Sequence, residues 1–171
     1  MPNAAWWIDH LQLRPHPEGG YYRRIYTAAD SLPASCLPGR YDSGTRPLAT
    51  AIYYLLPGDH CSRLHRLKAD EIWHFYYGAG LTVHIIDEDG DYRPARLGHD
   101  PHAGQSFQSV VRAGCWFGAT VDDPDTFALL GCTVTPGFDF ADFELGERSS
   151  LLRQHPRHEA LIMRLTRATG E

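Results

Sequence analysis

The sequence is poor in lysine and contains no run of basic residues longer than two. Only Lys68 is a lysine among sixteen basic residues, and the formal net charge is -5 at pH 7. Because nucleic acids are bound through clustered positive charge, this composition argues against a nucleic-acid partner. Lys68 lies on a stretch that reads as a turn, and it is the only candidate for Schiff-base chemistry. Anions would therefore be bound by arginine, whose planar guanidinium suits bidentate contacts.

Long apolar runs, a signal peptide pattern and the Cys-x-x-Cys spacing are also missing. We therefore expect no membrane association and a cytoplasmic location. The four cysteines are expected to be free thiols that act as small core hydrophobes, and a redox role is the less favoured alternative. These cysteines are Cys36, Cys61, Cys115 and Cys132.

Turn-forming residues are abundant, with 12 prolines and 16 glycines spread over 171 residues. Short runs rich in β-branched and aromatic residues lie between these turn signals, a pattern typical of a β sandwich or barrel. A chain of this length can bury a full core by itself. We expect one all-β domain over residues 1–171. The predicted strands are YYRRIYT, LATAIYYLL, EIWHFYY, LTVHIID, YRPARLG, SFQSVV, CWFGATV and FALLGCTV.

Helical patterns occur only near the two ends of the chain. Asn3 can cap a short helix through AAWWIDHL. Near the carboxyl end, GERSSLLRQHP and RHEALIMRLTR place apolar residues at helical spacing and predict two short helices outside the β body. Residues 28–46 hold Pro33 and Pro38, with Pro47 directly after them, and are expected to form a long surface loop.

The stretch SRLHRLKADEIWHFYYG, residues 62–78, combines histidines, an Asp-Glu pair and aromatic residues. The order Gly58, His65, Glu71, Gly78 resembles the first sequence motif of the cupin superfamily. Together with PHPEGGYYRRIY, AIYYLLPGD, GCWFGATV and PGFDFADFEL, it is similar to a cupin branch long catalogued as a domain of unknown function. The resemblance implies a cupin jelly roll, or double-stranded β-helix, with short N- and C-terminal helices.

Metal-binding cupins hold their ion with three residues of the first motif and one histidine of the second. By this resemblance His65 keeps the first ligand position and Glu71 the third, whereas Leu67 and Phe117 replace the other two. Two ligands fall short of the three that a catalytic zinc site normally has. We therefore expect no metal and no other cofactor. A metal-dependent enzyme with an unusual ligand set, completed by a bulge or by His84, is the alternative.

A histidine and a glutamate inside a barrel can form a general acid/base pair. The segment SRLHR resembles part of the metal-free dTDP-sugar epimerases, which implies that His65 is the base and Glu71 its orienting partner. A pocket tyrosine, Tyr22 or Tyr76, would be the acid. Side chains alternate along a strand. We therefore expect Trp73 and Phe75 to line the substrate pocket with Glu71, together with Trp116. His74 should point the other way.

Three plainer interpretations compete with this site. The pair of His65 and Glu71 can be a satisfied buried hydrogen bond, and the aromatic residues can be ordinary core. The segment HPEGGYY can be a tight turn that begins a strand. In its functional interpretation, Glu18 and Tyr22 belong to the pocket rim, and Glu18 accepts hydrogen bonds from neighbouring backbone amides.

The sequence thus predicts a cupin that binds a small polar molecule, such as a nucleotide or nucleotide-sugar, with isomerase or epimerase chemistry by His65. A non-catalytic small-molecule binding protein is the main alternative. By the family resemblance, the position of Arg24 is commonly acidic, so an arginine there favours an anionic ligand. The aromatic segment YYRRIYT would be costly to leave as a bare edge. We therefore expect a homodimer in which the N-terminal segment contacts the partner.

Overall fold

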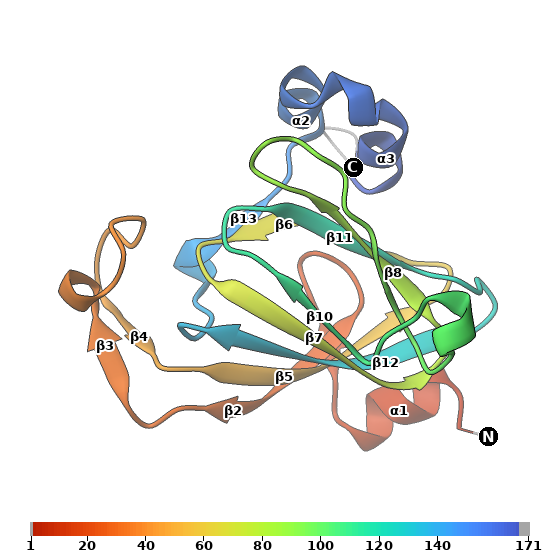
Figure 1. Ribbon diagram of the computed structural model, residues 1–171. Helices are drawn as coiled ribbons and strands as arrows, with labels where there is room; N and C mark the ends of the chain where they lie inside the picture. Colours follow the sequence, from red (N-terminus) through yellow and green to blue (C-terminus); the bar gives the residue numbers. More distant parts are fainter. Residues whose placement is uncertain (1, 168–171) are drawn as a thin grey trace.

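Two antiparallel sheets face each other and enclose the core in the computed structural model, which describes residues 2–167 (Figure 1). The six-stranded sheet has the order β1 (Arg14–Pro15), β2 (Tyr21–Thr27), β5 (Thr50–Pro57), β12 (Phe127–Thr135), β7 (Asp70–Gly78) and β10 (Gln108–Val111). The five-stranded sheet has the order β13 (Phe143–Leu145), β6 (Cys61–Leu67), β11 (Trp116–Val121), β8 (Leu81–Ile86) and β9 (Ala95–Leu97). The prediction of an all-β jelly roll is confirmed.

The predicted helices are present and lie outside the sheets, as Figure 1 shows. Asn3 caps α1 (Ala4–His10), because its Oδ1 accepts a hydrogen bond of 2.9 Å from the Trp6 backbone nitrogen. This helix covers part of the outer face of the six-stranded sheet. The outer face of the five-stranded sheet packs against α2 (Arg148–Gln154) and α3 (Glu159–Arg164). Four short 3-10 helices complete the elements of residues 2–167: Ala34–Cys36, Pro101–Ala103, Phe140–Asp142 and Pro156–His158. No helix among residues 2–167 is long and apolar enough to cross a membrane.

Residues 28–46, expected to form a long surface loop, are largely exposed but contain two short paired strands. Most of this segment forms an arm, in which β3 (Ser31–Pro33) pairs with β4 (Thr45–Pro47), and the arm projects to one side of the barrel in Figure 1. Proline is tolerated here because a two-stranded ribbon leaves one edge of each strand without ladder partners. A buried ion pair anchors the arm: the Arg46 guanidinium donates to both carboxylate oxygens of Asp142, at 2.6 and 2.8 Å.

Strand alternation orients β7 as predicted. Trp73 is 1% exposed and Phe75 is 9% exposed, and both belong to the core between the sheets with Glu71 on the same face. His74 points outward, where its ring lies 3.1 Å from the Thr133 hydroxyl, and Tyr76 is half exposed. One face of this strand therefore builds the barrel interior and the other faces outward.

An irregularity in β6 changes which of its side chains point inward. Phe117 pairs with His65, but two residues further along β11, Ala119 pairs with Ser62. Three steps on β6 thus oppose two steps on β11, which is a β-bulge. In a regular strand Ser62 and His65 would point to opposite faces. The bulge lets both side chains reach into the barrel.

Candidate functional site

A pocket opens into the barrel between the two sheets, at the end where the arm leaves the six-stranded sheet. The space between the protein atoms is about 480 Å³, a value that includes open solvent at its mouth. Its walls are mostly apolar, with a few polar side chains that converge. The lining residues are His16, Glu18, Tyr22, Arg24, Thr50, Ile52, Tyr54, His65, Leu67, Glu71, Cys132, Val134, Phe138 and Phe143.

The turn between β1 and β2 brings Glu18 to the pocket. Gly19 has φ +118°, and a Cβ there would lie 2.3 Å from the Cys61 carbonyl oxygen, so both the backbone conformation and the space require glycine. Gly20 also has a positive φ, of +67°. The turn docks on β6 because the Arg63 backbone nitrogen donates to the Glu18 carbonyl oxygen at 2.9 Å. The tight turn expected for HPEGGYY is present, and β2 begins directly after it.

The Glu18 carboxylate is the centre of a polar cluster. Its Oε1 accepts a hydrogen bond of 2.9 Å from the Ser62 hydroxyl. Its Oε2 lies 3.2 Å from His65 Nε2 and 3.3 Å from His16 Nδ1. The expectation that backbone amides satisfy this carboxylate is therefore wrong. Burial by itself would raise the pKa of Glu18, but the two histidines and the Ser62 hydrogen bond lower it to about 2.

His65 has a partner on each ring nitrogen. Its Nδ1 lies 2.7 Å from the Arg63 carbonyl oxygen, which can only accept, so this nitrogen carries a proton. Its Nε2 faces Glu18, not Glu71. The expectation that Glu71 orients His65 is corrected on this point, because the bulge in β6 and the turn after β1 bring Glu18 there first. Burial lowers the pKa of His65, and the Glu18 carboxylate offsets this only in part.

Glu71 occupies a different environment in the same pocket. Its Oε2 accepts a hydrogen bond of 3.1 Å from the Trp73 indole nitrogen, and the residue is 7% exposed. Burial raises the pKa of Glu71 to about 8, and the negative charge of Glu18 adds to this rise. At neutral pH, Glu71 is therefore protonated while Glu18 is ionised. Titratable groups whose environments separate their pKa values in this way are suited to acid and base roles.

The structure brings four of the seven predicted site residues to the pocket and leaves three outside its lining. Those on the lining are Glu18, Tyr22, His65 and Glu71. Trp73 lies in the core behind Glu71, and Phe75 lies further along the barrel near His99, at a ring distance of 6.2 Å.

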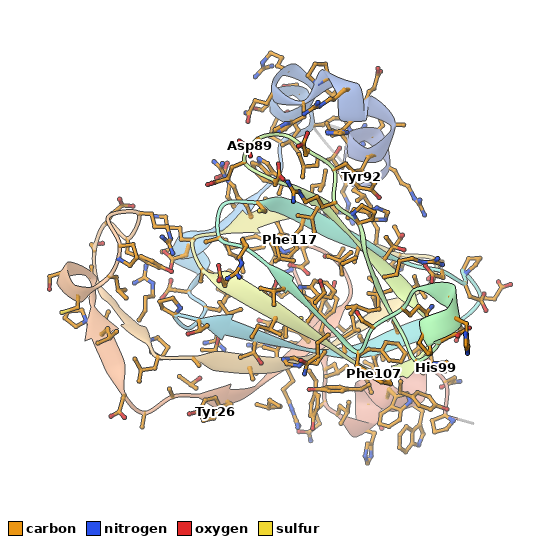
Figure 2. The ribbon with its side chains drawn as sticks, viewed as in Figure 1. Tyr26, Asp89, Tyr92, His99, Phe107 and Phe117 are labelled. Atoms are coloured by element: carbon orange, nitrogen blue, oxygen red, sulfur yellow. The ribbon has the colours of Figure 1, made fainter. Side chains whose placement is uncertain are left out.

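Trp116 is on the opposite face of the sheet from the pocket. It packs with Leu64, Ile86 and Leu151 against the C-terminal helices, and Arg66 lies over its ring at 4.6 Å. The neighbouring residue Phe117 points into the barrel instead (Figure 2). Its ring centre is 4.1 Å from that of His65.

Sequence reasoning overlooked His16, which lines the pocket and contacts Glu18. The signal was available in PHPEGG, because two residues separated by one can present side chains to the same side of an extended chain. It also overlooked Tyr54, whose hydroxyl donates to the Gly19 carbonyl oxygen at 2.9 Å. Phe138 and Phe143 also line the pocket. They belong to the PGFDFADFEL block, which carried the family resemblance but for which the sequence predicted no role in the site.

A metal centre of the usual cupin kind does not fit these side chains. Leu67 lines the pocket where a second histidine would stand, and Phe117 takes the place of the last ligand. Within residues 2–167, no three His, Cys, Asp or Glu side chains are grouped so as to hold a metal ion. His84 cannot complete a set, because its ring points away from the pocket to Tyr92 and Thr120.

Two antiparallel sheets that close over an inner pocket with convergent polar groups define a small-molecule-binding protein of the cupin type. The comparison with known proteins places it more narrowly. The family described as "Cupin superfamily (DUF985)" matches residues 5–146, and the chain belongs to this family.

Relatives of similar length share the fold over nearly the whole chain. Protein SO0799 from Shewanella oneidensis is 40% identical with a TM-score of 0.87, and the match covers 98% of this chain and 99% of that one. A hypothetical protein from Leishmania major is 35% identical with a TM-score of 0.87, covering 98% of this chain and 100% of that one. The uncharacterized protein YML079W of Saccharomyces cerevisiae is 31% identical over 144 residues, which are 79% of this chain and 71% of the yeast protein.

A more distant likeness concerns the fold alone. Oxalate decarboxylase from Bacillus subtilis is 15% identical with a TM-score of 0.54, and the match covers 89% of this chain and 36% of that enzyme. One cupin unit of this size thus corresponds to about a third of that chain.

Proposed function

We propose that this cupin is a metal-independent isomerase or epimerase that moves protons on a small polar molecule held in the barrel. The observation that supports this most is the pair of carboxylates in one pocket. The pKa of Glu18 is lowered to about 2, while that of Glu71 is raised to about 8. One group is therefore held as an anion among histidines, and the other keeps a proton that it can donate at neutral pH.

The proposed step removes a proton from a carbon next to a carbonyl group. The C–H bond breaks, its electron pair forms the C=C bond of an enol, and the cluster of Glu18 with His65 and His16 accepts the proton. Glu71 donates its proton to the carbonyl oxygen. The step is completed when the enol returns that proton to Glu71 and Tyr22, whose ring lies beside His16, protonates the carbon. Exchange with water then restores Tyr22 and the cluster.

Tyr22 is the acid candidate that the pocket geometry favours over Tyr76. Its ring is 9% exposed, lines the pocket and lies edge-on to His16 at 4.6 Å. Tyr76 is 50% exposed on the outward face of β7. A proton from Tyr76 would therefore have to cross the sheet to reach the pocket.

The proposed ligand carries an anionic group, as a nucleotide or nucleotide-sugar does. Arg24 lies on the pocket lining, donates to the Phe138 carbonyl oxygen at 3.2 Å and stands over the Phe138 ring at 5.7 Å. No carboxylate within residues 2–167 forms an ion pair with it. With its phosphate bound at this guanidinium, the ligand would extend its sugar into the pocket toward Glu71. Because Glu71 is neutral at pH 7, it does not repel an anion, and Glu18 is the one ionised carboxylate among the described residues that line the pocket.

Deuterium exchange tests the proposed chemistry. The protein is incubated in D2O with a panel of ketone-bearing nucleotide-sugars and sugar phosphates, and NMR follows deuterium entering the carbon next to the ketone. We expect exchange with the unaltered protein and a loss of about 100-fold or more in Glu71→Gln. In Arg24→Gln, the anionic compounds should bind more weakly. Arg23→Gln is the matched control, since Arg23 contacts Gln12 outside the pocket.

A non-catalytic binding protein is the second candidate, and one observation favours it. Both ring nitrogens of His65 already have partners, as in a satisfied buried histidine. In that case panel compounds would bind without exchange. His65→Asn would then cost roughly 1 to 3 kcal/mol of stability and leave ligand affinity unchanged.

We also propose that the protein is a cytoplasmic homodimer that uses its N-terminal strands. Strand β1, which has two residues, forms the edge of the six-stranded sheet, and the adjacent β2 exposes Ile25 and Tyr26, which are 46% and 54% exposed. Figure 2 shows Tyr26 on the outside of the barrel. The four cysteines are free thiols, which is compatible with a reducing compartment. Light scattering that gives the mass of a single chain at micromolar concentration would contradict the dimer.

A further inference from the structure

We propose that His16 is the residue that exchanges a proton with the ligand, and that His65 acts behind it by positioning Glu18. This inference rests on the proposed function and names the residue within the accepting cluster that contacts the substrate.

The first observation is that His65 has no nitrogen left for a ligand. Its Nδ1 is 2.7 Å from the Arg63 carbonyl oxygen, and its Nε2 is 3.2 Å from Glu18 Oε2. Its side chain is 3% exposed, and the ring packs between Phe117 and Phe143, at 4.1 and 5.4 Å between ring centres. A general base must come within hydrogen-bond reach of the proton that it takes. His65 would have to break a contact to do so.

The second observation is that His16 has such a nitrogen. Its Nδ1 faces Glu18, whereas its Nε2 makes no hydrogen bond with any residue of 2–167. That atom is not sealed from solvent either. Among the described residues, the only fully buried side-chain nitrogen or oxygen without a partner is Trp7 Nε1. Because His16 lines the pocket, its Nε2 is open to a molecule inside it.

The tautomer that a base needs follows from the contact with Glu18. Two contacts compete at His16 Nδ1: it can donate to Glu18 Oε2 at 3.3 Å, or, in the opposite tautomer, accept from the Glu18 backbone N–H at 3.4 Å. A hydrogen bond to a carboxylate is roughly twice as strong as one between neutral groups. It therefore favours a proton on Nδ1 and leaves the lone pair on Nε2. Aromatic contacts hold the ring in place, with Tyr22 at 4.6 Å and Phe143 at 5.9 Å between ring centres.

In the proposed step, His16 Nε2 forms a bond to the substrate proton as the C–H bond breaks and its electrons pass into the enol. The imidazolium that results is stabilised by Glu18 through Nδ1–H. Ser62 donates to Glu18 from the other side, and His65 donates to it through Nε2–H when both of its ring nitrogens carry a proton, so His65 is a positioning residue. Loss of the proton from His16 to water restores the neutral ring.

Two substitutions separate these roles. In His16→Asn the amide nitrogen can replace Nδ1 toward Glu18, but nothing replaces Nε2. We expect deuterium exchange to fall about 100-fold or more with an unchanged melting temperature. In His65→Gln the amide nitrogen can replace Nε2 toward Glu18, so exchange should stay within about tenfold of the unaltered protein. His84→Asn, outside the pocket, is the control. Full exchange in His16→Asn, or an equal loss in His65→Gln, would overturn the inference.

A measurement without ligand keeps the inference testable if no panel compound exchanges. Imidazole 15N NMR at pH 8 reports which ring nitrogen carries the proton. We expect a proton on Nδ1 and a bare Nε2 for His16, and a proton on Nδ1 for His65. A proton on His16 Nε2 would overturn the assignment of the base. Absence of exchange with every compound that binds would instead count against the proposed function.

Discussion

Two buried histidines on the five-stranded sheet, His65 and His84, have similar exposure and different partners. His65 is 2% exposed and faces a carboxylate inside the barrel, whereas His84 is 7% exposed and points outward. Hydroxyl groups satisfy both nitrogens of His84: Tyr92 lies 2.8 Å from Nδ1 and Thr120 lies 3.0 Å from Nε2. Figure 2 shows Tyr92 near the C-terminal helices, and neither Tyr92 nor His84 is on the pocket lining.

This difference distinguishes a candidate functional residue, His65, from His84, a buried polar residue whose hydrogen bonds are all satisfied. Burial lowers the pKa of His84 to about 4, with Arg164 adding to the effect, so the ring is neutral at pH 7. Neutral hydroxyl groups satisfy both of its ring nitrogens, so His84 has no charged partner that could stabilise an added proton. His65 belongs to a cluster with an ionised carboxylate and a second histidine that opens to a cavity. The proposed proton transfer requires the second arrangement.

The largest expected effect concerns Glu71, because its pKa is raised from 4.5 to about 8. The folded protein holds this proton while the unfolded chain releases it, so the stabilising contribution is complete below pH 4.5 and is lost as pH rises to about 8. Over that range stability should fall by roughly 3 to 5 kcal/mol. Glu71→Gln should abolish this fall and be more stable at pH 8. Urea unfolding at pH 5 and pH 8 measures it, and an unchanged pH dependence in the variant would contradict it.

Glu18→Gln should have the next largest effect, in the opposite direction. Loss of the charge weakens contacts with two histidines and should cost about 2 to 3 kcal/mol at pH 7. Because the pKa of Glu18 is lowered to about 2, its contribution is present above pH 4.5 and lost as pH falls toward 2. Urea unfolding at pH 7 and pH 3 should show the difference shrinking in acid. Glu88→Gln, at an exposed site, is the control. An equal loss of stability in that variant would show that the effect of Glu18→Gln is not specific to the pocket.

Thr120→Val tests the outer histidine, with a smaller effect. The change keeps the shape of the side chain and leaves His84 Nε2 without a partner, so we expect a loss of about 1 to 2 kcal/mol. Deuterium exchange on panel compounds should not change, since the pocket is untouched. Thermal melting and the exchange assay measure the two outcomes. Reduced exchange with a normal fold would mean that the two histidines are coupled.

Tyr92→Phe should have the smallest effect. Tyr92 is 41% exposed, so water can replace its hydroxyl at His84 Nδ1. A change of about 0.5 kcal/mol or less is expected. A loss of stability as large as that of Thr120→Val in the same melting experiment would contradict this expectation. It would show that the contact between Tyr92 and His84 is more strongly desolvated than the exposure of Tyr92 indicates.

The elements that local pattern decides were predictable from sequence. Strand β7 follows from alternation, the terminal helices follow from apolar spacing, and the first cupin motif ends at Gly78 for a physical reason. Gly78 has φ +99°, and a Cβ there would meet the Phe127 carbonyl oxygen at 2.1 Å. Such a requirement restricts a single position to one residue type, so it can be recognised directly in the sequence.

The parts of the site that depend on distant packing were not predictable. Trp116 and Phe117 are both buried, because helices cover one face of β11 and the core covers the other. Alternation therefore could not tell which of them faces the pocket. Glu18 reaches His65 from 47 residues away through a docked turn and a bulge, and the bulge exists only once β6 pairs with β11. No local pattern encodes that contact.

Carboxyl 13C NMR of glutamate-labelled protein tests the central claim most directly, because it reads the protonation of both pocket carboxylates without a ligand. We predict one resonance that titrates near pH 8 and disappears in Glu71→Gln, and another that titrates near pH 2 and disappears in Glu18→Gln. If both resonances titrate near 4.5, the value of an ordinary glutamate, the pocket does not separate acid from base and the proposed chemistry is contradicted.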